Sequence, residues 1–226
     1  MLINKILNRI LNPKSSSGIQ VHRHKEYYGT EYGGWYICPD TITRDSIVYS
    51  FGVGEDISFD LEMTKRFDCA VYAFDPTPRS VEWMKSQELP QRFHFFEYGI
   101  AGYDGMAKFN PPENPEHVSY TMLDRPSTSH SAIEAKVYRL ETIMNMLGHK
   151  KIDVLKMDIE GGEYEVIEDL TKADIEIGQL LVEFHHRFEH VGVSRTRRAI
   201  RLLNNKGFRI FHVSPSKEEY SFVRIE

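Results

Sequence analysis

The sequence predicts an α/β fold with a mostly parallel sheet, and three segments carry this prediction. Residues 47–75 contain a β-branched and aromatic run, a glycine turn, a helical pattern and a second apolar run, which together make one βαβ unit. Residues 152–167 repeat the order of buried strand and helix. Residues 208–225 contain two strand-like runs around a Ser-Pro-Ser turn. A hairpin of this kind gives a parallel sheet an antiparallel edge.

Length and composition indicate a single well-buried domain. The chain has 226 residues, of which 41% are hydrophobic. Its formal net charge of -5 disfavours a general nucleic-acid binder. Two cysteines give no basis for a disulfide framework or a zinc site. No apolar run approaches the roughly 20 residues that a membrane span needs, so we expect no membrane-spanning segment. We expect the protein to be cytoplasmic.

The chain divides into three parts. Residues 1–20 are predicted to form an amphipathic helix and a linker, residues 21–45 an aromatic and glycine-rich segment, and residues 46–226 the main domain. The apolar stripe within residues 1–13 favours packing on the domain itself or on a second subunit of a homo-oligomer. Peripheral contact with a membrane surface is the alternative. Residues 21–45 show no strand or helix period, which predicts a loop whose aromatic rings cover the domain or line the mouth of a site.

The glycine turn of the βαβ unit predicts an adenosine-containing ligand. Gly52 and Gly54 follow the first strand, and Asp75 closes the second strand 21 positions after Gly54. The glycines allow the backbone to approach the ligand closely, and the Asp75 carboxylate can accept hydrogen bonds from both ribose hydroxyls. Ile57 stands where a dinucleotide fingerprint needs its third glycine, and Glu55 would repel a pyrophosphate. The pattern therefore favours S-adenosylmethionine over NAD.

The middle of the chain predicts the rest of the binding region. A Pro-Thr-Pro turn opens a helix, residues 93–96 form a third strand, and the following segment to Ile100 is expected to contact the adenine base. Residues 110–131 lose periodicity, and a loop of this length inside a compact domain is often functional. We expect this loop to form a substrate-binding rim, with candidate contacts at His117, Tyr120 and Arg125.

Acidic residues and a histidine gather at two strand ends in the second half. Asp158 and Glu160 follow one buried strand, and Glu163 begins the next helix, where it is expected to compensate the helix dipole. The strand ending at His185 places Glu183 on the same face as that histidine and at the same sheet edge as Asp158. Two acids and a histidine can hold a divalent metal such as Mg²⁺, or can act as base and orienting group.

The segment IDVLKMDIEGGEYEVI, residues 152–167, closely resembles the signature of the FkbM-type S-adenosylmethionine-dependent methyltransferases. The resemblance extends to LETI at residues 140–143, LLVEFHH at 180–186 and the terminal GFRIFHVSPSKEEYSFV, and covers roughly residues 46–225. It implies a class I methyltransferase fold, a Rossmann-like seven-stranded sheet with an antiparallel C-terminal strand and helices on both faces. It also implies O-methylation of a hydroxyl on a sugar or other small natural product.

This resemblance leads to a working hypothesis for the site. The expected cofactor-binding residues are Gly52, Gly54, Glu55, Asp75, Ile100 and Asp158. The expected catalytic residues are His185 as base with Asp158 and Glu183, and the same three are the candidate metal ligands. Two alternatives remain open: an NAD-dependent oxidoreductase, and a non-catalytic module that binds an adenosyl ligand or a partner.

Overall fold

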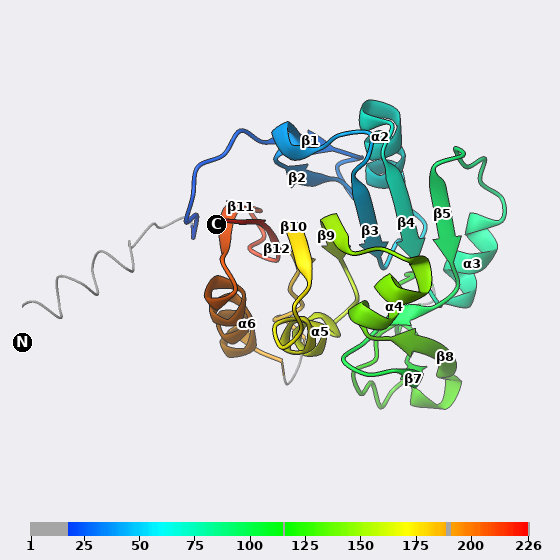
Figure 1. Cartoon of the computed structure of the whole chain (residues 1–226). Helices are drawn as coiled ribbons and strands as arrows, with labels where there is room; N and C mark the ends of the chain where they lie inside the picture. The colour runs from blue at the N-terminus through cyan, green and yellow to red at the C-terminus, as the bar shows by residue number, and fades with distance from the viewer. Residues whose placement is uncertain (1–17, 115, 189–190, 226) are drawn as a thin grey trace, which may run out of the picture.

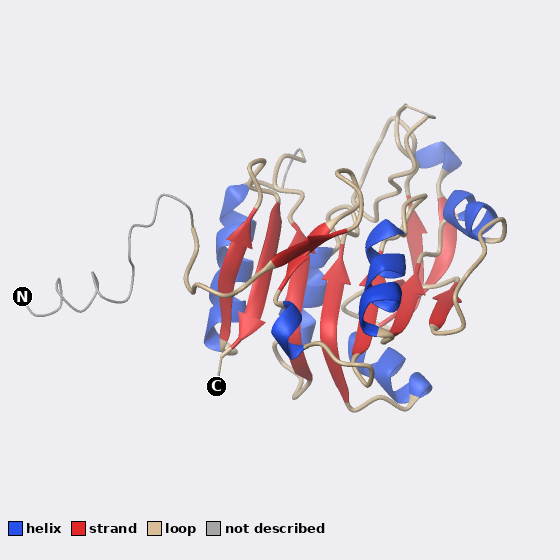
Figure 2. Cartoon of the chain, turned by 90° about the horizontal axis from the view of Figure 1, so that it is seen from above, coloured by secondary structure: helices blue, strands red, loops and turns tan. Residues whose placement is uncertain are grey.

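The computed structural model describes residues 18–114, 116–188 and 191–225, which form a central sheet flanked by helices (Figures 1 and 2). The amphipathic helix expected in residues 1–13 lies outside the described residues. None of the helices in the described ranges has the length and hydrophobicity needed to cross a bilayer.

The main sheet has seven strands in the order β11-β12-β10-β9-β3-β4-β5. Neighbouring strands run parallel except on both sides of β12, which is antiparallel to β10 and to β11. This arrangement confirms the predicted class I methyltransferase fold. The strands are β3 (Ile47–Phe51), β4 (Ala70–Phe74), β5 (Phe93–Phe96), β9 (Lys151–Met157), β10 (Glu176–Glu183), β11 (Phe208–Val213) and β12 (Glu219–Arg224).

Both faces of the sheet are buried. Leu180 and Val182 belong to one apolar cluster with residues of α4, α5 and α6, while Leu181 belongs to a second cluster with residues of α2 and α3. Because successive strand residues point to opposite faces, an almost continuous apolar run can supply both cores. The helices are α2 (Ser58–Phe67), α3 (Pro78–Met84), α4 (Leu140–Leu147), α5 (Glu163–Leu170) and α6 (Val193–Asn205).

Residues 21–45 form more than the predicted loop. They contain a short antiparallel hairpin, β1 (Glu26–Tyr28) and β2 (Trp35–Ile37), followed by a 3-10 helix at Pro39–Thr41. Strands of three residues are too short to show a period of two, which explains why the sequence pattern missed them. The hairpin lies against α2 and β12, and its connecting loop carries Tyr32, which is 83% exposed.

A second, three-stranded sheet extends the domain beyond the central sheet. It consists of β6 (Gly99–Ile100), β8 (Ile133–Tyr138) and β7 (Gly105–Phe109), in that order. Residues 110–131 connect β7 to β8, with one bridge between Asn110 and Thr121 and a 3-10 helix at Ser129–Ser131.

Candidate functional site

A cavity of about 490 Å³ lies at the carboxyl edge of the parallel strands. Ligands of open α/β sheets bind at this edge. The loops after β3, β4, β9 and β10 contribute to its wall, together with the small sheet and the 110–131 loop. The predicted site residues that line the cavity are Gly52, Gly54, Asp75, Ile100, Asp158 and Glu183.

Gly52 brings the β3 loop against the end of β9. Its N–H donates to the Phe74 carbonyl at 3.0 Å, and the N–H of Asp158 donates to the Phe51 carbonyl at 3.1 Å. Gly52 has a φ of +74°, and a Cβ at this position would overlap the carbonyl oxygen of Asp158. Glycine is therefore required both for the backbone conformation and for the close approach of these two loops.

Asp75 stabilises the glycine turn and the turn that follows β4. Its Oδ2 accepts a hydrogen bond from the Gly54 N–H at 3.0 Å. Its Oδ1 accepts from the N–H and the hydroxyl of Thr77 at 2.9 and 2.6 Å. A carboxylate oxygen accepts about two hydrogen bonds, so Oδ1 is already saturated. In this arrangement Oδ2 has room for one further hydrogen bond, so the interaction of Asp75 with two ribose hydroxyls stays a prediction.

The structure does not bring Glu55 to the cavity wall. Its carboxylate forms a paired contact with Arg79, whose Nε lies 2.8 Å from Oε1 and whose Nη2 lies 3.1 Å from Oε2. Arg79 Nη1 also donates to the carbonyls of Glu116 and His117 at 3.1 and 3.2 Å. Glu55 therefore connects the glycine turn to the 110–131 loop through Arg79 and does not line the cavity.

The 110–131 loop reaches the cavity through a different set of residues from the one expected. Tyr120 lines the cavity as predicted. The His117 side chain is exposed, and Arg125 donates to the Pro111 carbonyl at 2.9 Å, so neither contributes to the wall. Val118, Ser119 and Met122 are the further wall residues of this loop. The sequence could not distinguish the wall residues from the other residues of this loop, because the segment has no periodicity.

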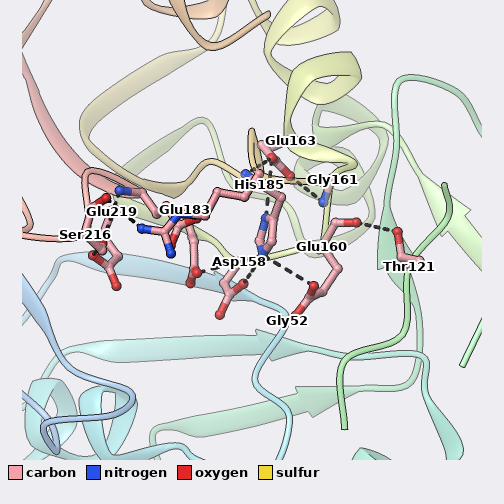
Figure 3. Close-up of polar contacts among 12 residues, drawn as sticks. Gly52, Thr121, Asp158, Glu160, Gly161, Glu163, Glu183, His185, Ser216 and Glu219 are labelled. Carbon is pink, nitrogen blue, oxygen red and sulfur yellow. Dashed lines mark hydrogen bonds and ion pairs between the residues drawn. The ribbon is translucent and has the colours of Figure 1, made fainter. Parts of the chain in front are cut away.

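Asp158, Glu160, Glu183 and His185 converge at one end of the cavity (Figure 3). Val182 pairs with Met157, so the residues that follow them, Glu183 and Asp158, lie side by side at the end of the two strands. The Nε2 of His185 lies 3.7 Å from Asp158 Oδ1, 3.4 Å from Glu160 Oε2 and 3.9 Å from Glu183 Oε1.

His185 lies behind this carboxylate wall. It is 8% exposed and is not among the cavity-lining residues, unlike Asp158 and Glu183. The structure therefore brings the three predicted catalytic residues together but does not place the imidazole in direct reach of a molecule in the cavity.

Glu163 fixes the position of His185 from behind. Its side chain is fully buried, and Oε1 accepts from the His185 backbone N–H at 2.9 Å while Oε2 accepts from the Gly161 N–H at 2.9 Å. Oε1 also lies 3.5 Å from His185 Nδ1. Glu163 does begin α5, but it supports the site directly, which goes beyond the dipole compensation expected from the sequence.

The cluster carries excess negative charge. Burial lowers the pKa of His185, but the carboxylates of Glu163, Asp158 and Glu160 outweigh it and raise the pKa above its ordinary value. Burial, and then repulsion by Asp158, raise the pKa of Glu183. The pKa values of His185 and Glu183 are both raised because several carboxylates lie in the same desolvated region as the single imidazole.

Some residues of the site were not predicted from the sequence. Lys156 is 4% exposed on β9, and its Nζ donates to the Gly52 carbonyl at 3.2 Å. A lysine inside an otherwise apolar strand was the available signal, because lysine is rarely buried without a partner. Tyr32 and Glu219 line the cavity from the β1–β2 hairpin and from β12. The sequence around Tyr32 and Glu219 does not indicate that they line the cavity, because the rest of the wall comes from distant segments of the chain.

Two fibrillarins are among the solved structures that align with this chain. The Methanococcus jannaschii fibrillarin pre-rRNA processing protein aligns with a TM-score of 0.48 and 13% identity over 81% of this chain and 68% of its own. The Aeropyrum pernix fibrillarin, solved with natively bound S-adenosyl-L-methionine, aligns with a TM-score of 0.44 and 11% identity over 90% of this chain and 83% of its own.

Curated relatives and a family model give the clearer relationship. Proteins named probable methyltransferase-like protein 24 from Rattus norvegicus and Homo sapiens are each 29% identical over 79% of this chain. The chain spans about half the length of these relatives, 48% and 47% respectively. The model of the methyltransferase FkbM domain matches residues 46–210, which include the glycine turn, Asp75 and the whole acidic cluster. The chain therefore belongs to the FkbM methyltransferase domain family.

Proposed function

We propose that this chain binds S-adenosylmethionine in the cavity and transfers the methyl group to a hydroxyl oxygen of a small acceptor. The observation that carries the proposal is a single cavity whose wall contains the glycine turn and Asp75 together with Asp158 and Glu183. Its volume of about 490 Å³ lies within the usual range of small-molecule sites, roughly 300–1,000 Å³. Membership of the FkbM family supports the same activity.

The wall residues fit this cofactor. Gly54 and Asp75 offer a backbone turn and one carboxylate lone pair to a ribose, and Ile100 and Phe109 offer an apolar surface to an adenine. Asp158 suits the ammonium group of the cofactor, whereas the acidic cluster would repel a pyrophosphate. When bound, the cofactor supplies an electrophilic methyl group.

The acidic cluster is proposed to activate the acceptor. An alcohol is a weak nucleophile until its proton is removed or its oxygen is polarised. Asp158 and Glu183 line the cavity, and we propose that they contact the acceptor hydroxyl. His185 lies behind them, so we propose that it orients these groups and that direct proton abstraction by the imidazole, expected from the sequence, is not its role.

A second hollow supports a carbohydrate as the acceptor. It has a volume of about 220 Å³ and shares the wall residues Glu31, Tyr32 and Glu219 with the main cavity. Its other wall residues include Tyr27, Trp35 and Tyr36 and the hydroxyl-bearing Ser214 and Ser216. Aromatic side chains beside hydroxyl and carboxylate groups suit a ligand with apolar C–H surface and many hydroxyls. We propose that the acceptor enters over this hollow.

Calorimetric titration tests cofactor binding. We expect the wild-type chain to bind S-adenosylhomocysteine, and Asp75→Ala to weaken binding by about 10- to 100-fold, since one hydrogen bond to a charged group contributes about 1.5–3 kcal/mol. The matched control is Asp153→Ala. Asp153 accepts from the Ile47 N–H at 2.8 Å, so it also supports a strand, but at the opposite edge of the sheet.

Three results of this titration would count against the proposal. Equal weakening by Asp75→Ala and Asp153→Ala would show a general effect on the fold. Binding of NAD in place of S-adenosylhomocysteine would support an oxidoreductase. Absence of binding by wild-type protein free of copurified ligand would support a non-catalytic module.

A further inference from the structure

We propose that Asp158, Glu183 and His185 form a binding site for a divalent cation. One potential ligand atom from each residue lies within 4.8 Å of the other two. Metal–ligand bonds of about 2.0–2.2 Å place two ligands of a shared ion roughly 3–4 Å apart. The His185 Nε2 lies 3.7 Å from Asp158 and 3.9 Å from Glu183, which is long for a hydrogen bond and suitable for a shared ion.

The position of His185 is an independent observation in favour of a ligand. The residue is more than nine-tenths buried, and its Nε2 faces the carboxylates of Asp158, Glu160 and Glu183 at 3.7, 3.4 and 3.9 Å. The Nδ1 side faces buried Glu163 at 3.5 Å, so Nε2 points at the carboxylates (Figure 3). Metal-binding histidines are usually oriented in this way by a carboxylate behind the second ring nitrogen.

The neighbouring groups favour a cation at the same place. Asp158 Oδ1 is buried without a hydrogen-bond partner among the described residues. The Glu160 carboxylate, 3.4 Å from His185 Nε2, is available as a further oxygen ligand. Lys156 directs its ammonium group to the Gly52 carbonyl. A divalent ion would give Asp158 Oδ1 a partner and offset the repulsion among the acids.

The ligand types select among cations. Carboxylate oxygens suit Mg²⁺ and Mn²⁺, whereas an imidazole favours Zn²⁺ and other transition ions. We therefore expect Zn²⁺ to bind most tightly, Mn²⁺ next and Mg²⁺ least, which differs from the Mg²⁺ suggested by the sequence. Asp158 and Glu183 also line the cavity, so a bound ion could polarise an acceptor hydroxyl. That catalytic consequence rests on the proposed function, but cation binding does not.

Titration of the full chain with metal ions tests the site. Chelator-treated protein is titrated with ZnCl₂, MnCl₂ and MgCl₂ by calorimetry, and bound Mn²⁺ is observed by electron paramagnetic resonance. We expect one ion per chain, and a loss of affinity of at least about 10- to 100-fold in Glu183→Gln and in His185→Gln, because even supporting residues of metal sites contribute this much. Asp158→Asn is a third variant should either of these fail to fold.

The control is Glu176→Gln, which removes an exposed carboxylate at the other end of β10 and should leave metal affinity unchanged. Circular dichroism verifies that each variant is folded. Failure of wild-type protein to bind any of the three ions would overturn the proposal, as would equal affinity in wild type and ligand variants. S-adenosylhomocysteine titration without metal, on the same samples, tests the proposed function separately.

Discussion

Replacing Gly52 by alanine is expected to lower the free energy of unfolding by about 3 kcal/mol and to abolish S-adenosylhomocysteine binding. The added Cβ would overlap the backbone carbonyl of Asp158, and the φ of +74° is unfavourable for an L-residue. Overpacking costs about 1–3 kcal/mol and a left-handed conformation about 1–2 kcal/mol. To relieve the overlap, the β3 and β9 loops must move apart, and both belong to the cavity wall. Urea unfolding followed by circular dichroism measures the first effect and calorimetry the second.

Gly148→Ala separates the two causes. Gly148 has the same φ of +74°, but a Cβ added there meets nothing within 4 Å. This variant should therefore show the conformational cost alone, about 1 kcal/mol, with cofactor binding unchanged. If both variants lost the same stability and both bound the ligand normally, the close approach of Gly52 and Asp158 would have no energetic importance.

The parts of the site that the sequence predicted depend on strand ends. Gly54 and Asp75 lie 21 positions apart because one helix connects two adjacent parallel strands, and that distance is visible in the sequence. Asp158 and Glu183 could likewise be placed together, since parallel strands end at a common edge. No side-chain conformation has to be known for either prediction.

The remaining features depend on geometry that the sequence does not express. His185 lies two residues after Glu183, the last residue of β10, and the conformation of the chain beyond the strand decides where the ring lies. The Phe188 N–H donates to the His185 carbonyl at 3.1 Å, a contact with no signature in composition or periodicity. Similarly, β6 and β1 contain only two and three residues, which is too few to show a pattern. The pairing of these short strands determines where Ile100 and Tyr32 lie.

Glu183→Gln is expected to reduce methyl transfer by about 100- to 1,000-fold while leaving S-adenosylhomocysteine binding unchanged. Glutamine keeps the size of the side chain but has no negative charge, so it neither attracts an acceptor proton nor ligates a cation well. Transfer of a labelled methyl group from S-adenosylmethionine to a panel of free sugars and glycosides provides the assay. The effect should appear in kcat, because Glu183 is proposed to act on the acceptor and ends β10, which β9 and β3 separate from the β4 strand that Asp75 follows.

The same substitution also separates activation from simple acceptor binding. If Glu183 only held the acceptor, Glu183→Gln would raise KM and preserve kcat, because an amide still forms hydrogen bonds with hydroxyl groups. Glu176→Gln should leave both parameters unchanged, since Glu176 is exposed at the other end of the same strand. A loss of kcat in Glu183→Gln, together with normal cofactor binding, would place acceptor activation at the acidic cluster. Retention of full kcat would remove Glu183 from the chemistry and restrict the cluster to binding or structure.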